Sequence, residues 1–164
     1  LTIAIEIGML LAVFLFMRRM AMVTNVGVFT REFNDEEERL DPMSIDKRNI
    51  PEGVEVYEIN GPFFFGAASK FKEAIDQVAK PPKVRIIRMR NVPAIDSTGI
   101  YSLEELLKSS QKEGTELIFS GIHAQPMFVL EGSGFFKKVN PADICGNIDL
   151  ALARAKELIE IREK

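Results

Sequence analysis

The sequence has few of the residues from which metal and thiol sites are built. Its 164 residues include one Cys, one His and no Trp. A single Cys excludes a disulfide framework within the chain and a multi-Cys zinc site. A single His excludes a multi-His metal centre, and a Ser-His-Asp triad would depend entirely on His123. We therefore expect no metal site.

The charged residues show no strong excess of one sign. Lys and Arg number 21 and Asp and Glu number 24, which gives a net charge of -3. This balance argues against the basic surface by which proteins bind nucleic acids. Hydrophobic residues make up 46% and charged residues 27%, so a disordered or collagen-like chain is excluded. The length fits one globular domain with room for an appendage.

Motifs that hold cofactors and nucleophiles are also missing. The sequence has no G-x-x-x-x-G-K-[ST] phosphate loop, no G-x-G-x-x-G dinucleotide loop and no G-x-S-x-G nucleophile elbow. We therefore expect no cofactor and no catalytic residue. A hydrolase that uses Ser97 or Cys145 with His123 stays as a minor alternative. Cys145 is otherwise expected to be a small buried or loop thiol, and His123 a surface histidine at a helix start.

The first residues form a long apolar run. In LTIAIEIGMLLAVFLFM only Glu6 is charged, and Arg18 and Arg19 follow at once. At about 1.5 Å per residue this run makes roughly 25 Å of helix, slightly less than the roughly 30 Å hydrocarbon core of a bilayer. We expect residues 1–19 to be the end of a transmembrane helix with its basic flank. The excess of Lys and Arg on cytoplasmic flanks then places everything after Arg19 in the cytoplasm.

Two other interpretations of the apolar run make different demands on its flanks. A secretory signal peptide carries basic residues before its apolar run and a small-residue cleavage site after it, whereas here Arg18 and Arg19 come after the run. A buried core helix requires no particular flanking residues, and it stays as the alternative to a membrane helix.

The rest of the chain divides into a linker and an α/β domain. Residues 20–53 are expected to be a linker with one strand, near 26–33, and an acidic loop. From residue 54 the expected strands are 54–59, 83–89 and 115–120, and the expected helices are 67–80, 98–112, 125–130 and one that begins at Asn147. Segment 135–139 is ambiguous and fits a short strand. The alternation of strands and helices predicts right-handed crossovers and a mainly parallel sheet.

The segment from Asp96 to Gly99 is the most informative for function. Asp96, Ser97, Thr98 and Gly99 lie between the end of a strand and the start of a helix, where open α/β sheets place their ligands. The helix amides and dipole there favour negative charge, so a phosphoryl group on the Ser97 hydroxyl would gain partners, although Asp96 would repel it. The alternative is that Asp96 or Ser97 only caps the helix.

A second candidate segment precedes the first helix of the domain. Gly61 and Pro62 form a turn, and Phe63, Phe64 and Phe65 follow it. The three phenylalanines are expected either to fill the core or to include one exposed side chain that contacts a partner or a membrane. Sequence alone leaves both interpretations open.

Two stretches of the sequence resemble a known family. Ile95-Asp96-Ser97-Thr98-Gly99, after a basic and apolar strand, resembles the D-S-x-G signature of STAS domains, which include bacterial anti-sigma-factor antagonists and the cytoplasmic tails of SulP (sulfate permease) anion transporters. The stretch VEVYEINGPFFFGAA, residues 54–68, resembles the transporter branch specifically. The resemblance covers most of residues 54–162.

The resemblance implies a fold and a location. The fold would be the α/β, anti-sigma-factor-antagonist-like STAS fold over residues 54–164. It has a mainly parallel or mixed sheet and about four helices, here preceded by part of a transmembrane helix. The domain would be a non-catalytic regulatory and interaction module of a secondary anion transporter, at the cytoplasmic side of the cell inner membrane.

The resemblance also implies partners and one regulatory residue. The membrane domain of the same polypeptide would be the main partner. A homodimer, a cytoplasmic regulatory protein and weak nucleotide binding are further possibilities, whereas nucleic acid is not expected. In the antagonists the serine after the motif aspartate is phosphorylated, and here that residue is Ser97. The alternative function is therefore a membrane-anchored, antagonist-like signalling module that is switched by phosphorylation of Ser97.

Overall fold

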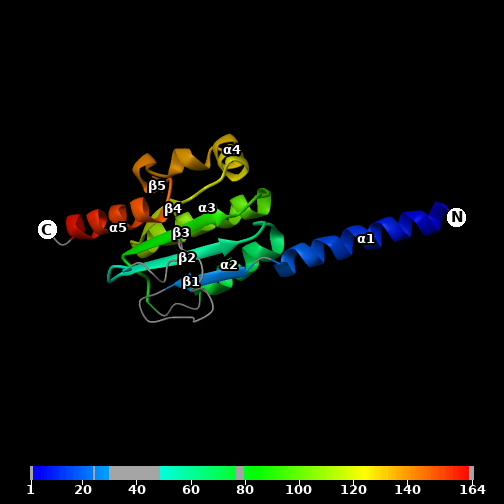
Figure 1. Cartoon of the computed structure of the whole chain (residues 1–164), viewed down its shortest axis with the longest axis horizontal. Helices are drawn as coiled ribbons and strands as arrows, with labels where there is room; N and C mark the ends of the chain where they lie inside the picture. The colour runs from blue at the N-terminus through cyan, green and yellow to red at the C-terminus, as the bar shows by residue number, and fades with distance from the viewer. Residues whose placement is uncertain (1, 24, 30–48, 77–79, 163–164) are drawn as a thin grey trace.

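A mixed five-stranded sheet forms the centre of the protein. The structure, a computed structural model, describes residues 2–23, 25–29, 49–76 and 80–162 (Figure 1). The sheet has the order β1-β2-β3-β4-β5. Its strands are β1 (Asn25–Phe29), β2 (Val54–Asn60), β3 (Val84–Asn91), β4 (Glu116–Ser120) and β5 (Ile144–Cys145). β1 is antiparallel to β2, and all other neighbours are parallel. The expected α/β class with a mainly parallel sheet is confirmed.

Helices cover both faces of this sheet. They are α1 (Thr2–Val23), α2 (Phe65–Asp76), α3 (Ser97–Glu113), α4 (Ala124–Gly132) and α5 (Ile148–Arg162), with the short 3-10 helices η3 (Phe135–Lys138) and η4 (Pro141–Asp143). Side chains of α2, α3 and α4 pack in the core on one face of the sheet, and side chains of α5 pack in the core on the other. The domain therefore has three layers.

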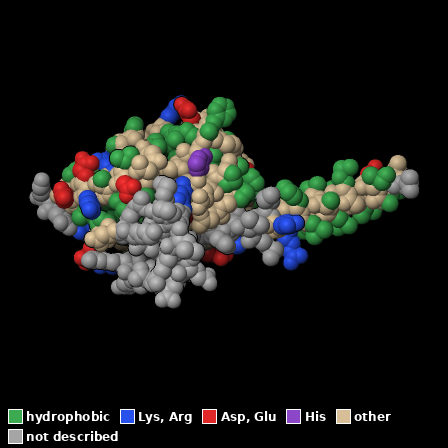
Figure 2. Space-filling view, viewed as in Figure 1, with side chains coloured by type: hydrophobic (Ala, Val, Ile, Leu, Met, Phe, Trp, Pro, Cys, Tyr) green, Lys and Arg blue, Asp and Glu red, His purple; other side chains and the backbone are tan. Residues whose placement is uncertain are grey.

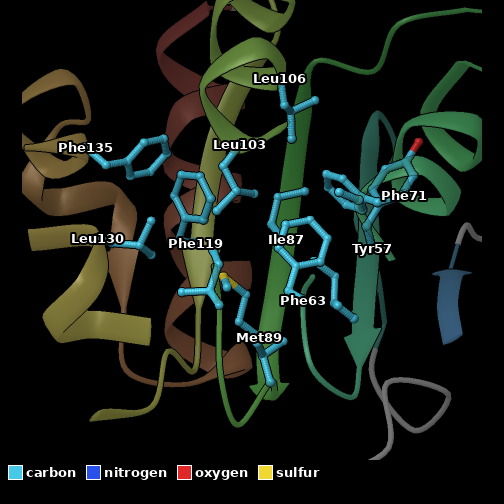
Figure 3. Close-up of a cluster of buried hydrophobic side chains, with 14 of the residues drawn as sticks. Tyr57, Phe63, Phe71, Ile87, Met89, Leu103, Leu106, Phe119, Leu130 and Phe135 are labelled. Atoms are coloured by element: carbon cyan, nitrogen blue, oxygen red, sulfur yellow. The ribbon is translucent and has the colours of Figure 1, made fainter. Parts of the chain in front are cut away.

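The two cores follow from the period of the strands. Successive side chains of a strand point to opposite faces, so a strand that is covered on both sides reads as a nearly continuous apolar run. β3 shows this pattern: Ile87 and Met89 belong to the core under α2, α3 and α4, whereas Val84 and Ile86 belong to the core under α5. Aromatic side chains fill much of the first core, and Phe119 meets Phe135 edge to face at 5.4 Å (Figure 3).

Some boundaries differ from the expected ones. β1 covers residues 25–29, and the rest of the expected strand, with the acidic loop, lies outside the described residues. Segment 135–139 contains the 3-10 helix η3 and not a strand, because Gly134 turns the chain at φ 77° and Phe135 points into the core. The two-residue strand β5 was not expected.

Helix α1 extends away from the domain (Figure 1). Its apolar side chains are exposed from Ile3 to Met17, and Leu10 and Phe14 are 71% and 68% exposed. Within the residues that the structure describes, no helix combines the length and the apolar character that crossing a membrane requires. The interpretation of residues 1–19 as the end of a transmembrane helix stays a prediction.

One end of the sheet is the place where three helices begin. β2, β3 and β4 are parallel and finish at the same end, which we call the carboxyl edge. α2, α3 and α4 follow these three strands in the chain, so all three helices begin at this edge. Asn25 of β1 pairs with Asn60 of β2, which places the end of α1 beside the carboxyl edge as well.

Candidate functional site

The segment that contains Asp96, Ser97, Thr98 and Gly99, which we call the signature loop, lies at the carboxyl edge, where β3 is followed by α3. Asp96 is extended, with φ -107° and ψ -178°, and it is the N-cap residue of α3. One oxygen of its carboxylate, Oδ1, accepts a hydrogen bond from the backbone N–H of Gly99 at 2.8 Å. The capping role predicted for this residue is confirmed. A cap of this kind stabilises a helix by about 1 kcal/mol, and the bond commits the carboxylate to its own helix.

The two hydroxyl residues of the loop differ in access. Ser97 is the first residue of α3 and is exposed, whereas Thr98 is half-buried. The first turn of α3 contains no acidic side chain. The positive end of the helix dipole therefore faces solvent around Ser97, with the Asp96 carboxylate as the neighbouring negative charge.

Gly99 allows the signature loop to approach the turn that contains Phe63, Phe64 and Phe65 closely. An added Cβ would lie 2.4 Å from the backbone oxygen of Phe63, 2.7 Å from Cγ1 of Ile95 and 2.8 Å from a ring carbon of Phe63. The first of these atoms belongs to the backbone and cannot swing aside. The glycine of the signature is therefore required for packing and not for a positive φ.

Replacement of Gly99 by Ala is expected to lower the free energy of unfolding by about 1–3 kcal/mol, the usual cost of overpacking. The direction of this change in the free energy of unfolding is informative, because replacement of Gly by Ala normally stabilises a helix interior. Gly132→Ala is the matched control, since an added Cβ there meets nothing within 4 Å. Urea unfolding followed by circular dichroism measures both. An equal response of the two variants would contradict the close approach.

The loop is tied to its neighbours on two sides. The backbone N–H of Phe63 donates to the carbonyl oxygen of Ala94 at 2.9 Å, and Phe63 and Ile95 form an isolated parallel bridge. From the other side, the Gln125 amide accepts from the N–H of Ile95 at 3.0 Å and donates to its carbonyl oxygen at 3.4 Å. Sequence reasoning missed Gln125, because nothing in its local pattern marks a contact 30 residues away.

The three phenylalanines of the turn have different environments. Phe63 is fully buried and meets Phe71 edge to face at 5.4 Å (Figure 3). Phe64 is half-buried, and Phe65 is 72% exposed. The structure therefore removes Phe63 from the expected partner surface, because its side chain fills the core. Phe65 is the most exposed of the three and is the side chain that a partner can reach most readily.

A buried ion pair lies at the carboxyl edge on the α5 side of the sheet. Glu58 of β2 and Arg88 of β3 are 3% and 2% exposed, and Nη1 of Arg88 lies 2.9 Å from Oε2 of Glu58. The other carboxylate oxygen lies 3.2 Å from Nε of Arg90 and accepts from the Asn91 amide at 3.3 Å. The carboxylate thus joins the ends of two strands just before the signature loop.

The remaining candidates for nucleophilic chemistry are not activated. His123 is exposed at the N-cap position of α4, and its Nε2 contacts the backbone oxygen of Arg90. Cys145 is half-buried, and burial raises the pKa of its thiol, which lowers the fraction of reactive thiolate. No group of three or more metal-binding side chains occurs among the described residues. In the part of the chain that the structure describes, His123 and Cys145 make their hydrogen-bond contacts with backbone oxygens and not with Ser97.

A cavity of about 300 Å³ lies away from the signature loop. It is bounded by the second half of α3, the start of β4, the segment with η3 and η4, and α5. Its charged lining is paired, since Arg154 lies 2.8 Å from Asp143 and Lys138 lies 2.6 Å from Glu104. Pairing of this kind favours a structural role for these charges.

Two of the solved structures that resemble this chain are similar to it in sequence as well as in fold. The crystal structure of a sulfate transporter family protein from Wolinella succinogenes is 45% identical, with a TM-score of 0.70, and the match covers 73% of this chain and 98% of that one. The STAS domain of a SulP transporter from Vibrio cholerae is 33% identical, with a TM-score of 0.61, over 69% of this chain and 88% of that one.

Comparison of the sequences points the same way. A family model described as the STAS domain matches residues 47–155. A Bacillus subtilis protein named as a sulfate transporter, YvdB, is 29% identical over 140 residues, which are 85% of this chain and 24% of that protein. The chain spans about a quarter of the length of the curated relatives that it matches. Two kinds of comparison thus lead to one family.

Proposed function

The chain belongs to the STAS domain family, and from that premise we propose that it is the cytoplasmic regulatory and interaction domain of a secondary anion transporter of the sulfate type. The observation that carries this proposal is the match to a solved sulfate transporter family protein, at 45% identity over almost all of that chain. The relatives named as sulfate transporters are about four times as long, so the transport machinery would lie outside the residues printed here.

Helix α1 supports a place at the inner membrane. Its exposed apolar side chains lie in water at a cost of about 25 cal/mol per Å², which burial in lipid or in a membrane domain would relieve. Arg18 and Arg19 follow the apolar run on the side of the STAS domain. Basic residues prefer the cytoplasmic side of a membrane helix, so the domain would lie in the cytoplasm.

The domain would act by contact and not by catalysis. Its signature loop is held by the Asp96 cap, the Gln125 amide and the bridge from Phe63, which fixes a surface at the carboxyl edge. On that surface Ser97 is exposed. We place the contact with the membrane domain of the same polypeptide at the signature loop around Ser97, since α1 joins the domain at the same edge.

Transport by the complete polypeptide tests this function. We expect the polypeptide that carries this chain to restore uptake of labelled sulfate, bicarbonate or a dicarboxylate in cells that lack their own transporter. Removal of residues 54–164 is expected to lower uptake per membrane-bound molecule by about ten-fold, an ordinary size for coupling between two sites. Recovery of the polypeptide in the soluble fraction, or no uptake of any of these anions, would contradict the proposal.

The same assay addresses the alternative, a module that is switched at Ser97. This alternative is favoured by the exposure of Ser97 at the first residue of α3. A phosphoryl group there would gain the helix amides, against repulsion from Asp96. In a switch, Ser97→Asp should differ from Ser97→Ala in uptake or in capture of a cytoplasmic partner, with both variants folded. Equal behaviour of wild type, Ser97→Ala and Ser97→Asp would exclude it.

A further inference from the structure

We propose that the carboxyl edge, on the layer of α2, α3 and α4, rests on the anionic lipid surface and contacts it through Phe65, Tyr101 and Phe128. This inference rests on the proposed function, since it requires α1 to enter a membrane. It goes further, because it names a lipid surface as a partner of the STAS domain itself and names the side chains that meet it.

The exposed aromatic residues of the domain are the first observation. Phe65, Tyr101 and Phe128 are 72%, 62% and 77% exposed, and in residues 49–76 and 80–162 no other aromatic side chain is strongly exposed. Each lies within the first five residues of a helix that begins at the carboxyl edge, at the first residue of α2 and the fifth of α3 and α4. Figure 2 shows hydrophobic side chains along α1 and on the adjoining end of the domain.

The attachment of α1 is the second observation, and it says what would cover this surface. Asn25 pairs with Asn60 at the end of β2, and Arg19 is six residues before Asn25. Six residues span at most roughly 20 Å, so the edge cannot be far from the point where the basic flank of α1 meets the headgroups. Tyr is enriched at such interfaces, and Phe is common on the apolar faces of segments that enter them.

The charges on this layer fit an anionic surface. The first turns of α2, α3 and α4 contain no acidic side chain, so their dipoles present partial positive charge at the edge. The Asp96 carboxylate is a negative charge at this edge, and its Oδ1 accepts a hydrogen bond from the N–H of Gly99 in its own helix. α5 also begins at this edge, but on the other layer and with Asp149 in its first turn. The surface is therefore limited to the α2, α3 and α4 layer.

Tryptophan fluorescence tests the contact directly, because the chain has no Trp of its own. The variants Phe65→Trp, Tyr101→Trp and Phe128→Trp each place one reporter at an exposed position. The protein is reconstituted in vesicles of phosphatidylcholine and phosphatidylglycerol with brominated acyl chains. Bromine is expected to lower the emission roughly two-fold, as for side chains within the roughly 5–10 Å interfacial layer. Quenching should weaken in vesicles without phosphatidylglycerol and in high salt.

Ile161→Trp is the matched control at the opposite end of the domain. Ile161 is 61% exposed, and its neighbour Arg162 lies 3.0 Å from Glu116, the first residue of β4. A Trp at this position should keep its full emission in brominated vesicles. Equal quenching at positions 161 and 65 would mean nonspecific adsorption and would overturn the proposal.

Phe14→Trp separates this inference from the proposed function. Phe14 lies in the apolar run of α1 and is exposed in the chain alone. Quenching at position 14 without quenching at 65, 101 and 128 would overturn the lipid contact, leave the proposed function in place and assign the aromatic surface to a protein partner. Absence of quenching at position 14 would contradict the membrane location on which both depend.

Discussion

Phe63→Ala is expected to lower the free energy of unfolding by about 3–5 kcal/mol, whereas Phe65→Ala is expected to change it by about 0.5 kcal/mol or less. The two residues stand two positions apart in the same turn, but Phe63 is fully buried and Phe65 is 72% exposed. Truncation of Phe63 would leave a cavity against the ring of Phe71 and beside the signature loop. Truncation of Phe65 removes a side chain that already lies in solvent.

Equilibrium unfolding in urea, followed by circular dichroism, measures both changes in one buffer. The slope of the free energy against urea should stay the same, since neither variant alters the surface that unfolding exposes by much. Quenching of the Tyr101→Trp reporter by brominated lipid should show the opposite order, with weaker quenching in Phe65→Ala and little change in folded Phe63→Ala. A small loss of stability in Phe63→Ala would mean that the turn does not enter the core.

The sequence patterns predicted the parts of the fold that depend on local periodicity. The alternation in 54–59 and the apolar runs in 83–89 and 115–120 indicated β2, β3 and β4, and these strands are confirmed. The cap at Asp96 was also predicted, as the alternative to a functional role of the loop, because a cap depends on one residue and its neighbours along the chain. These features need no knowledge of distant contacts.

The missed features depend on contacts between distant residues. Gln125 bonds to Ile95 and Glu58 to Arg88, at separations of 30 residues, and no local pattern marks either pair. β5 has two residues, and it is a strand because both of them pair with residues of β4. The turn that follows Pro62 shows the same limit, because three identical phenylalanines carry no sign of which one is buried. Their environments are set by the bridge to Ile95.

Loss of the Glu58 carboxylate is expected to be the other large change. Glu58→Ala should lower the free energy of unfolding by about 3–5 kcal/mol, the usual effect of breaking a buried ion pair. The carboxylate is approached by Arg88 at 2.9 Å and by Arg90 at 3.2 Å, in a place where Glu58 and Arg88 are almost inaccessible to water. The two guanidinium groups would keep their charge and lose this counterion.

An exposed pair of the same length provides the comparison. Glu105 and Lys108 also lie 2.9 Å apart, but their side chains are 46% and 61% exposed. Glu105→Ala is therefore expected to have a far smaller effect than Glu58→Ala, since water and salt screen the pair. The two contacts have the same length, so a larger loss of stability in Glu58→Ala than in Glu105→Ala would show that burial determines how much an ion pair contributes.

Replacement of both partners distinguishes an ion pair that stabilises the fold from one that is only costly to break. The double variant Glu58→Leu with Arg88→Met removes the buried pair, and we expect it to be more stable than Glu58→Leu alone, because the buried Arg88 guanidinium no longer remains after loss of the Glu58 carboxylate and only the half-buried Arg90 does. Urea unfolding of the single and double variants gives the coupling free energy. A double variant less stable than either single variant would mean that the pair itself holds β2 and β3 together below the signature loop.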